Sequence, residues 1–457
     1  MVQSLSHYYR VPADPLGSIS GAKPSGDTGF FQFGPGTVCY GKSASGVSRK
    51  IGNSGRYDAL ESVRIDESEI HLPFDPATVI ENLRRERYEG SLAPRLERIF
   101  SQDWTLATYY SLRSILPVAL RRKLQRIYLS GWKDRPFPAW PVDFTVDTLH
   151  EKLLRLSMEA GGRRRMPFIW FWPDGASNCL ILTHDVETSA GRDFTPQLID
   201  LDESYGFRAS FQVVPESRYQ VPGTYVENIR NRGCEFNVHD LNHDGLLYRD
   251  RVDFLRRAKK INGYCHRYDA RGFRAGSMYR NLDWYEAFEF SYDMSMPNVA
   301  HLEPKRGGCC TVFPFFVGNI LEIPLTTSED YSVFHILNED SITLWKKQLE
   351  LIRQRNGLMS VLAHPDYLIS SRTRSLYESL LDHLREMVSN EKIWATLPGE
   401  VDQWWRARSK MNLIQKDGDW VIEGPEKERA RIAYAILEGD CLVYDLAGVY
   451  APDASRS

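Results

Sequence analysis

The sequence predicts an α/β fold built on a parallel sheet. From Asn178 to about Trp405, short apolar segments alternate with longer ones whose apolar residues recur three and four positions apart. Such alternation is typical of strands and helices joined as βα repeats. The region of roughly 230 residues is long enough for a barrel. In addition, reactive side chains directly follow several of the apolar segments, at the end of the sheet where α/β folds collect functional groups.

The expected strands are short and nearly continuous in apolar residues, as in a sheet covered on both faces. They are Cys179–Thr183, Ala209–Val214, Cys234–Val238, Gly272–Phe273, Leu321–Pro324 and Leu358–Ala363. The expected helices between and after them are Thr195–Tyr205, Asp250–Asn262, Asn281–Phe288, Ile342–Arg355 and Thr373–Ser389. We assign residues 166–408 to this barrel-like domain.

Two regions precede the barrel. Residues 1–60 form a Gly/Ser-rich leader in which Phe30–Tyr40 can form a hairpin. Residues 61–165 are expected to be a helical accessory region. One of its helices begins at Asp75-Pro76, because proline is favoured in the first turn. The other helices expected there are Trp104–Leu116, Pro117–Leu129 and Val146–Ala160.

A small β-rich unit is predicted after the barrel, at residues 409–457. Trp420–Glu423, Ala430–Leu437 and Asp440–Leu446 have the composition of strands. Glu438-Gly439-Asp440 lies between two of these apolar runs and is a hairpin signal. The predicted fold is therefore a barrel-like α/β domain with a helical region before it and a β-rich appendage after it.

Composition narrows the classes of function. The 457-residue chain has 26% charged residues, a net charge of −3 and a pI of about 6.4, so nothing in it calls for a nucleic acid or an anionic membrane. No apolar stretch reaches the ~18 residues of a membrane helix, and no signal peptide is evident. The seven cysteines contain no CxxC pair, which favours a reducing compartment. We therefore expect a soluble, cytoplasmic protein.

The chemistry is expected at Leu180–Glu187, read LILTHDVE. Its apolar run ends at His184, Asp185 and Glu187. Carboxylates at the end of a buried strand are costly to desolvate unless they are paired or bind a cation. Acidic residues here therefore predict a charged partner or a metal.

His239 and His243 form a second cluster. If Val238–His243 turns helically, the i, i+4 spacing places both imidazoles on one face, within reach of a single ion. With a carboxylate from another strand, the two histidines would complete a three-ligand site with open positions for water and substrate. Imidazole ligation favours Zn²⁺, with Co²⁺ or Ni²⁺ as alternatives.

Four motifs now stand in a defined order along the chain. They are Thr183-x-Asp185-x-Glu187, His239-x-x-x-His243, Phe273-Arg274-x-Gly276 and Leu362-x-His364-Pro365. In this order they resemble the polysaccharide deacetylases of the NodB-homology, or carbohydrate esterase 4, type. The resemblance covers Asn178–Trp405, about half of the chain. It implies a distorted (β/α)7-type barrel, a divalent metal and a carbohydrate substrate from which an N-acetyl group is removed.

The resemblance also implies roles for the residues of the first two motifs. By order, Asp185 is the general base and Glu187 is a metal ligand together with His239 and His243. The reverse assignment, with Asp185 on the metal, stays open. His184 is an additional ligand, a hydrogen-bond partner or simply a polar residue of the loop.

The last two motifs supply the remaining roles. Arg274 is expected to orient a buried carboxylate, and His364 to protonate the leaving amine. A backbone N–H at or near Tyr279 would help to hold the oxyanion, and Leu362 would line the pocket for the acetyl methyl group. The acid that orients His364 is left open among four residues: Asp269, Asp283, Asp293 and Asp366.

The chain departs from the family pattern at three positions. Val186 stands where a second aspartate is common, Asp240 where serine or threonine is usual, and Gly276 where proline is usual. Three hypotheses follow: a metal-dependent N-deacetylase of a polysaccharide or its precursor, a hydrolase of the same fold for another C–N bond such as a small amide or ureide, and a catalytically impaired sugar-binding protein.

Overall fold

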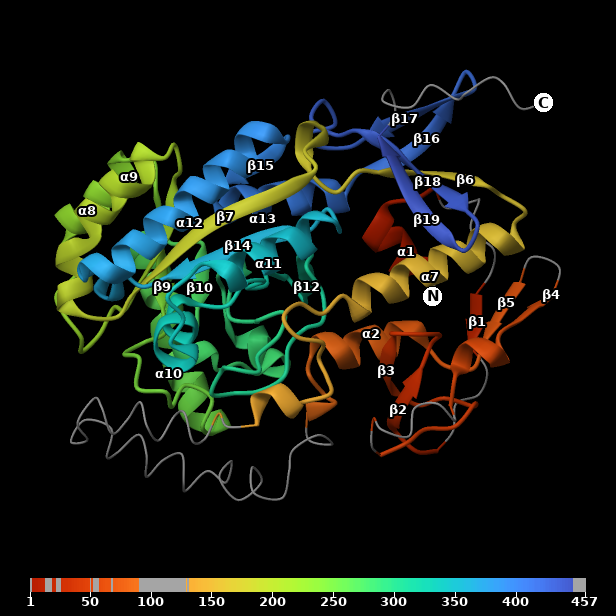
Figure 1. The fold of residues 1–457 in the computed structure, drawn as a ribbon, viewed down its shortest axis with the longest axis horizontal. Coiled ribbons are helices and arrows are strands. Elements are labelled where there is room, and N and C mark those ends of the chain that lie inside the picture. The colour runs from red at the N-terminus through yellow and green to blue at the C-terminus, as the bar shows by residue number, and fades with distance from the viewer. Residues whose placement is uncertain are drawn as a thin grey trace. The chain divides into compact units, whose positions relative to one another are not determined.

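The chain is divided into two compact units in the computed structural model, which describes residues 2–12, 19–21, 26–49, 51, 57–66, 69–89, 129 and 131–446 (Figure 1). One unit comprises Met1–Ser91, Phe144–Ser177 and Gln403–Ser457. The other comprises Leu92–Asp143 and Asn178–Asp402 and contains all four motifs. Among the described residues, no helix has the length and apolar character needed to cross a membrane.

The second unit is built around a nine-stranded sheet in the order β12-β13-β11-β10-β9-β8-β7-β14, with β15 also paired to β7. All neighbours in this sheet are parallel except β12 and β13. The strands are β7 Asn178–Val186, β8 Ala209–Val213, β9 Glu235–His239, β10 Gly272–Arg274, β11 Tyr292–Asp293, β12 Phe315–Val317, β13 Ile320–Glu322, β14 Leu358–Ala363 and β15 Ile393–Thr396. The predicted α/β barrel-like fold is thus confirmed as a curled parallel sheet.

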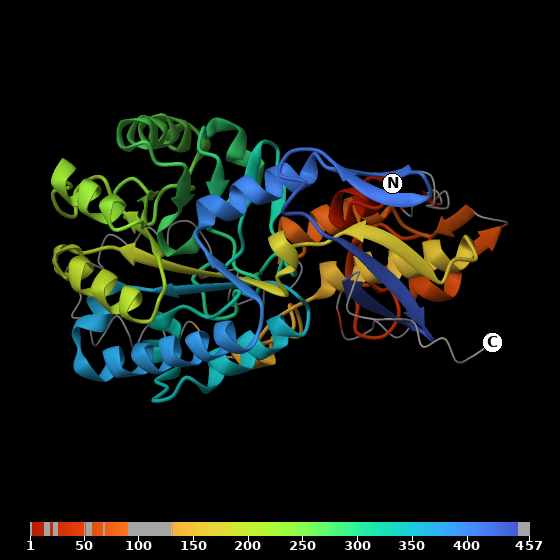
Figure 2. The same ribbon diagram turned by 90° about the horizontal axis from the view of Figure 1, so that it is seen from above.

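Helices lie along the outside of the curled sheet (Figure 2). They are α8 Ser189–Ser204, α9 Gly223–Asn231, α10 Arg251–Tyr268, α11 Thr343–Arg353, α12 Ser371–Asn390 and α13 Pro398–Ser409. Polar caps define several of their starts: Thr188 accepts a hydrogen bond from the Gly191 N–H at α8, and Asp250 accepts one from the Asp253 N–H at α10. The segment predicted as the helix Asn281–Phe288 is a 3₁₀-helix, η6 Leu282–Ala287.

β7 pairs with three other strands, more than any other strand of this sheet. β14 follows one edge over Cys179–His184. The other edge is shared, with β15 on Asn178–Ile181 and β8 on Leu182–Val186.

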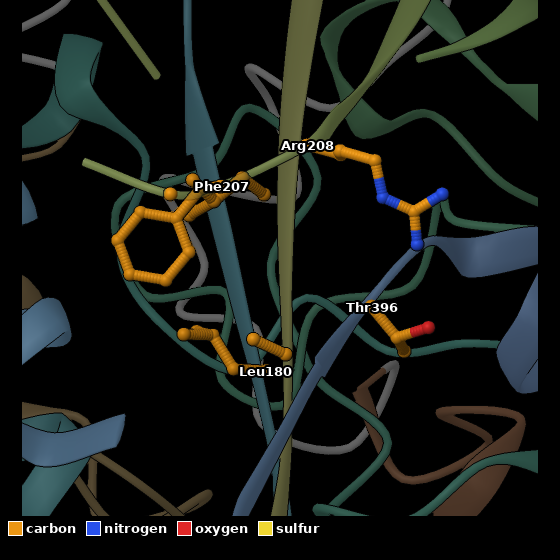
Figure 3. Close-up of a pocket in the computed structure, with 7 residues that line it drawn as sticks. Leu180, Phe207, Arg208 and Thr396 are labelled. Carbon is orange, nitrogen blue, oxygen red and sulfur yellow. The ribbon is translucent and has the colours of Figure 1, made fainter. Parts of the chain in front are cut away.

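A small pocket of about 40 Å³ lies where β15 and β8 diverge along β7 (Figure 3). It is lined by Leu180, Leu182, Gly206, Phe207, Arg208, Ala395 and Thr396. It includes none of the residues of the four motifs.

In its described residues, the first unit combines short sheets with helices. β18 Ile432–Glu438 pairs with β19 Cys441–Leu446 and with β6 Arg165–Ile169, and β16 Asn412–Lys416 forms a hairpin with β17 Asp419–Glu423. Near the N-terminus, β1 Ile19–Gly21, β5 Glu69–Leu72 and β4 Arg64–Asp66 form one sheet, and β2 Gly29–Gln32 pairs with β3 Val38–Gly41. The helices are α1 Val2–Tyr9, α2 Pro76–Arg84 and α7 Thr145–Ala160.

The flanking elements match the sequence in part. The C-terminal strands, the hairpin over Phe30–Tyr40 and the helix starting at Asp75-Pro76 all form, with Asp75 capping α2. The region 61–165, expected to be helical, also contains β4 and β5. The helices predicted at Trp104–Leu116 and Pro117–Leu129 lie outside the described residues, apart from Leu129.

Candidate active site

The site begins at the carboxyl end of β7. Side chains alternate between the two faces of a strand, so Thr183 and Asp185 point the same way. Glu187 follows one residue beyond the strand and continues this set. Val186 belongs to the opposite set and is fully buried. This alternation explains why the second carboxylate of the motif stands at 187 and not at 186.

Arg274, the last residue of β10, holds Asp185. Its Nη1 donates to Asp185 Oδ1 at 2.8 Å and lies 3.1 Å from Thr183 Oγ1, while its Nε donates to the Met294 carbonyl at 2.9 Å. Arg274 is 0% exposed and Asp185 2%. The two charges are therefore taken out of water together and are joined by one charge-assisted hydrogen bond.

His239 and His243 meet, but not on a helix. His239 is the last residue of β9, and His243 lies in the loop that follows. Asp240 and His243 both have φ of +54°, in the left-handed region, so the loop doubles back. The ring centroids are 4.9 Å apart. The predicted helical turn is wrong, whereas the predicted proximity of the two imidazoles is confirmed.

Glu187, His239 and His243 have the geometry of a metal-binding group. One donor atom from each lies within 4.8 Å of the others. His239 Nδ1 is 3.0 Å from the Arg274 carbonyl, which leaves Nε2 free to present its lone pair. The buried Nε2 atoms of His239 and His243 make no hydrogen bond among the described residues, although His243 Nε2 is only 2.8 Å from Glu187 Oε1. Two orphaned imidazole nitrogens facing a carboxylate fit a divalent cation.

His364 lies on the other side of Glu187. Its Nε2 is 3.5 Å from Glu187 Oε1, and its Nδ1 is 2.6 Å from Asp330 Oδ1. The His364 backbone N–H also donates to Asp330 Oδ2 at 2.7 Å. The orienting acid is therefore Asp330, which the sequence did not single out.

None of the four acids considered from the sequence forms a hydrogen bond with His364 in the described part of the chain. Asp269 caps the end of α10, Asp283 lies exposed in η6, and Asp293 bonds to Tyr285 and Ser295. Asp366 is near His364, but its Oδ1 makes no hydrogen bond within the described part of the chain.

The charges at the site shift the pKa values of its carboxyl groups and of His364 in opposite directions. Burial raises the pKa of Asp185, but Arg274, His239 and His364 lower it further, so it lies below its ordinary value. Burial likewise raises the pKa of Glu187, yet His243 and the other imidazoles bring it well below its usual range. Burial lowers the pKa of His364, but Asp330 and Glu187 outweigh this and hold it well above its usual value. The pKa values of the two carboxyl groups are thus shifted downward and that of the His364 imidazole upward.

The other residues singled out from the sequence have clear positions. His184 bonds through Nδ1 to the Ala363 carbonyl and through Nε2 to Asp202 Oδ2, both at 2.9 Å, so both of its nitrogens are engaged away from the metal-binding group. Leu362 is fully buried and packs with Met278 and Leu325. The Tyr279 N–H is bonded to the Gly276 carbonyl at 3.2 Å.

Searches among known proteins found similar structures only. No family model matches the chain, and no curated protein matches it. A putative polysaccharide deacetylase from Mycobacterium smegmatis aligns over 55% of this chain and 98% of its own, with 16% identity and a TM-score of 0.42. Peptidoglycan deacetylase PdaC from Bacillus subtilis aligns over 51% and 93%, with 13% identity and a TM-score of 0.33.

The chain is similar to polysaccharide deacetylases. It is also similar to the Puue allantoinase, which aligns over 51% of this chain and 92% of its own, with 11% identity and a TM-score of 0.42. Because these identities and TM-scores are low, the function must be argued from the side chains of the site itself.

Proposed function

We propose that this protein is a metal-dependent hydrolase that removes N-acetyl groups from an N-acetylated polysaccharide or its precursor. The observation that carries the proposal is the grouping of Glu187, His239 and His243 between two hydrogen-bonded pairs. In one pair the pKa of an acid, Asp185, is lowered, and in the other the pKa of a base, His364, is raised. One pair is Asp185 with Arg274, and the other is His364 with Asp330. Amide hydrolysis needs a proton acceptor for the attacking water and a proton donor for the leaving amine.

Glu187, His239 and His243 are the proposed metal ligands. When bound, a divalent cation there lowers the pKa of a coordinated water and polarises the amide carbonyl. Two imidazoles with one carboxylate favour Zn²⁺, with Co²⁺ or Ni²⁺ as alternatives. Asp185 is less suited to direct ligation because one of its oxygens is already bonded to Arg274.

Asp185 is the proposed general base. Its Oδ2 is 3.6 Å from His239 Nε2 and so faces the ligand group, while Arg274 holds its Oδ1. Its lowered pKa keeps it ionised and able to accept a proton from the attacking water.

His364 is the proposed general acid. Its Nδ1 is held by Asp330, so Nε2 is the nitrogen that faces Glu187 and the site. The imidazolium then donates this Nε2 proton to the amine as the C–N bond breaks, which releases acetate and a free amino sugar.

Two further residues complete the proposed site. Leu362, two residues before His364, forms a buried apolar cluster with Met278 and Leu325, and this cluster would line the pocket for the acetyl methyl group. The Tyr279 turn would contribute a backbone donor to the oxyanion. Ser277 and Met278 in that turn have φ of +55° and +51°, a strained backbone of the kind that collects at active sites. The Tyr279 N–H would have to exchange its 3.2 Å bond to Gly276 for one to substrate.

The first test is metal content per chain after loosely bound ions are removed, measured by mass spectrometry on wild type and on His239→Ala/His243→Ala. We expect near-stoichiometric metal in wild type and its loss in the double variant. His266→Ala is the control, because the side chain of this histidine is 70% exposed and lies 3.3 Å from Glu289, which is not a motif residue. No metal in wild type after reconstitution with Zn²⁺, Co²⁺ or Ni²⁺ would refute the proposal.

Activity then separates the substrate classes. Acetate release is measured on N-acetylated oligosaccharides, and amine or ammonia release on non-sugar amides and ureides. Asp185→Asn should keep the metal but lose at least ~100-fold in rate, because only the proton acceptor is removed. Turnover of the non-sugar substrates alone would retain the hydrolase chemistry and refute the carbohydrate substrate.

A further inference from the structure

Asp240 is a buried carboxylate next to the ligand group that the proposed mechanism does not use. It follows His239 directly and is 0% exposed. Its backbone N–H donates to the Arg274 carbonyl at 2.8 Å, and its Oδ1 accepts from the Leu241 N–H at 2.6 Å. Its Oδ2 has no hydrogen-bond partner among the described residues. No arginine, lysine or histidine of the described chain forms an ion pair with it.

Gly276 makes the room that this carboxylate occupies. A Cβ added at Gly276 would lie 2.6 Å from Asp240 Oδ2, 2.9 Å from His243 Cδ2 and 3.2 Å from His243 Nε2. Distances below 3.0 Å force the neighbours to move. Any larger residue at 276 would therefore displace both the Asp240 carboxylate and a proposed metal ligand.

The two positions are also two of the three departures from the sequence pattern noted above. Asp240 replaces serine or threonine, and Gly276 replaces proline. The left-handed φ of +54° at Asp240 favours aspartate over the β-branched threonine. Since the two side-chain positions compete for one space, the departures are a single coupled feature of the site.

We propose that Asp240 is a positioning residue of the metal site, which shapes the loop carrying His243 and places a further buried carboxylate beside it, and that Gly276 is required to accommodate it. The part of this inference that concerns metal affinity, the charge half, rests on the proposed function; the part that concerns the space shared by Asp240 and Gly276, the steric half, does not. A buried carboxylate without a cation is costly, and a divalent cation on Glu187, His239 and His243 would offset that cost. Asp240 thereby raises the affinity of the site for cations without being a ligand.

The steric half is tested by a double-mutant cycle on metal-free protein, with the thermal midpoint as the readout. Gly276→Ala should lower the midpoint by several degrees, and Asp240→Ser/Gly276→Ala should recover at least half of that loss. Gly263→Ala is the matched control, because a Cβ there meets nothing within 4 Å. Additive effects of the two substitutions would overturn the coupling.

The charge half is tested with Asp240→Asn, which keeps the shape and tolerates the left-handed backbone. Competition with a chromophoric chelator should show Zn²⁺ affinity reduced about 10- to 100-fold, with the metal-free thermal midpoint unchanged or raised. The exposed Asp283→Asn is the control and should bind as wild type does. Equal affinity in wild type and Asp240→Asn overturns this inference and leaves the proposed function intact. A wild type that binds no Zn²⁺ overturns both.

Discussion

Asp330 holds His364 by two hydrogen bonds, one to the imidazole Nδ1 at 2.6 Å and one from the backbone N–H at 2.7 Å. Asp330 is 0% exposed and His364 4%. The carboxylate thus fixes both the ring orientation and the nitrogen that carries the outer proton. A histidine held in this way is suited to deliver a proton in one direction.

Asp330→Asn should therefore impair catalysis without affecting metal binding. The amide is a weaker acceptor for the imidazole N–H and carries no charge, so the pKa of His364 should fall and its orientation should loosen. We expect kcat to fall about 100-fold with metal content unchanged. Asp366→Asn is the contrast, because Asp366 is near His364 but makes no hydrogen bond to it. An Asp330→Asn enzyme within threefold of wild type would exclude the proposed role of His364.

Removing Arg274 should destabilise the protein and shift its pH dependence. Arg274→Met leaves the buried Asp185 carboxylate without its ion-pair partner, which costs about 3–5 kcal/mol in typical proteins. The pKa of Asp185 should rise, so the acidic limb of any pH–rate profile should move to higher pH. Urea unfolding and the pH profile measure the two effects.

The matched variant for this prediction is Arg274→Met/Asp185→Asn, which removes both charges. It should regain much of the lost stability while remaining inactive, because the proton acceptor is gone. If the double variant is as unstable as Arg274→Met alone, the loss comes from the bonds of Arg274 to Thr183 and Met294, and not from an uncompensated carboxylate.

The fold could be predicted from the sequence because its long elements carry strong patterns. β7 and β14 read as continuous apolar runs, and α10 and α12 have regular helical spacing. By contrast, β11 has two residues and β12 three, and neither is predicted, although the equally short β10 is expected at Gly272–Phe273. The nine-residue α9 was also missed.

The candidate site could be predicted where local spacing decides the geometry. Asp185 and Glu187 share a face because of strand alternation, which holds whatever surrounds them. His239 and His243 were brought together correctly, but by a loop with left-handed residues and not by a helix. Asp330 precedes His364 by 34 residues and belongs to no periodic segment. Only the folded chain brings this pair together.

We predict that His184 is not a ligand of the metal. Both of its nitrogens are bonded, to Ala363 and Asp202, and Asp202 also accepts from Tyr377 at 2.8 Å. His184→Leu should therefore leave metal content near that of wild type while lowering stability by about 1–3 kcal/mol, since Asp202 loses a buried partner. Metal analysis and urea unfolding on the same sample test both. Loss of the metal from a folded His184→Leu protein would make His184 part of the site.

His150, in the first unit, should make the free energy of unfolding fall as the pH is lowered. It is 1% exposed on α7, stacks on Tyr8 at 4.0 Å with its Nδ1 2.8 Å from the Val146 carbonyl, and burial lowers its pKa from 6.5 to about 3. A base with a lowered pKa contributes fully above pH 6.5 and destabilises the fold as the pH falls toward 3. At pH 5 the loss should be about 2 kcal/mol, from about 1.36 kcal/mol for each pH unit below 6.5. His150→Phe keeps the stacked ring but cannot titrate, so its unfolding free energy relative to wild type should rise between pH 7 and pH 5. A difference that stays constant over this range would contradict the prediction.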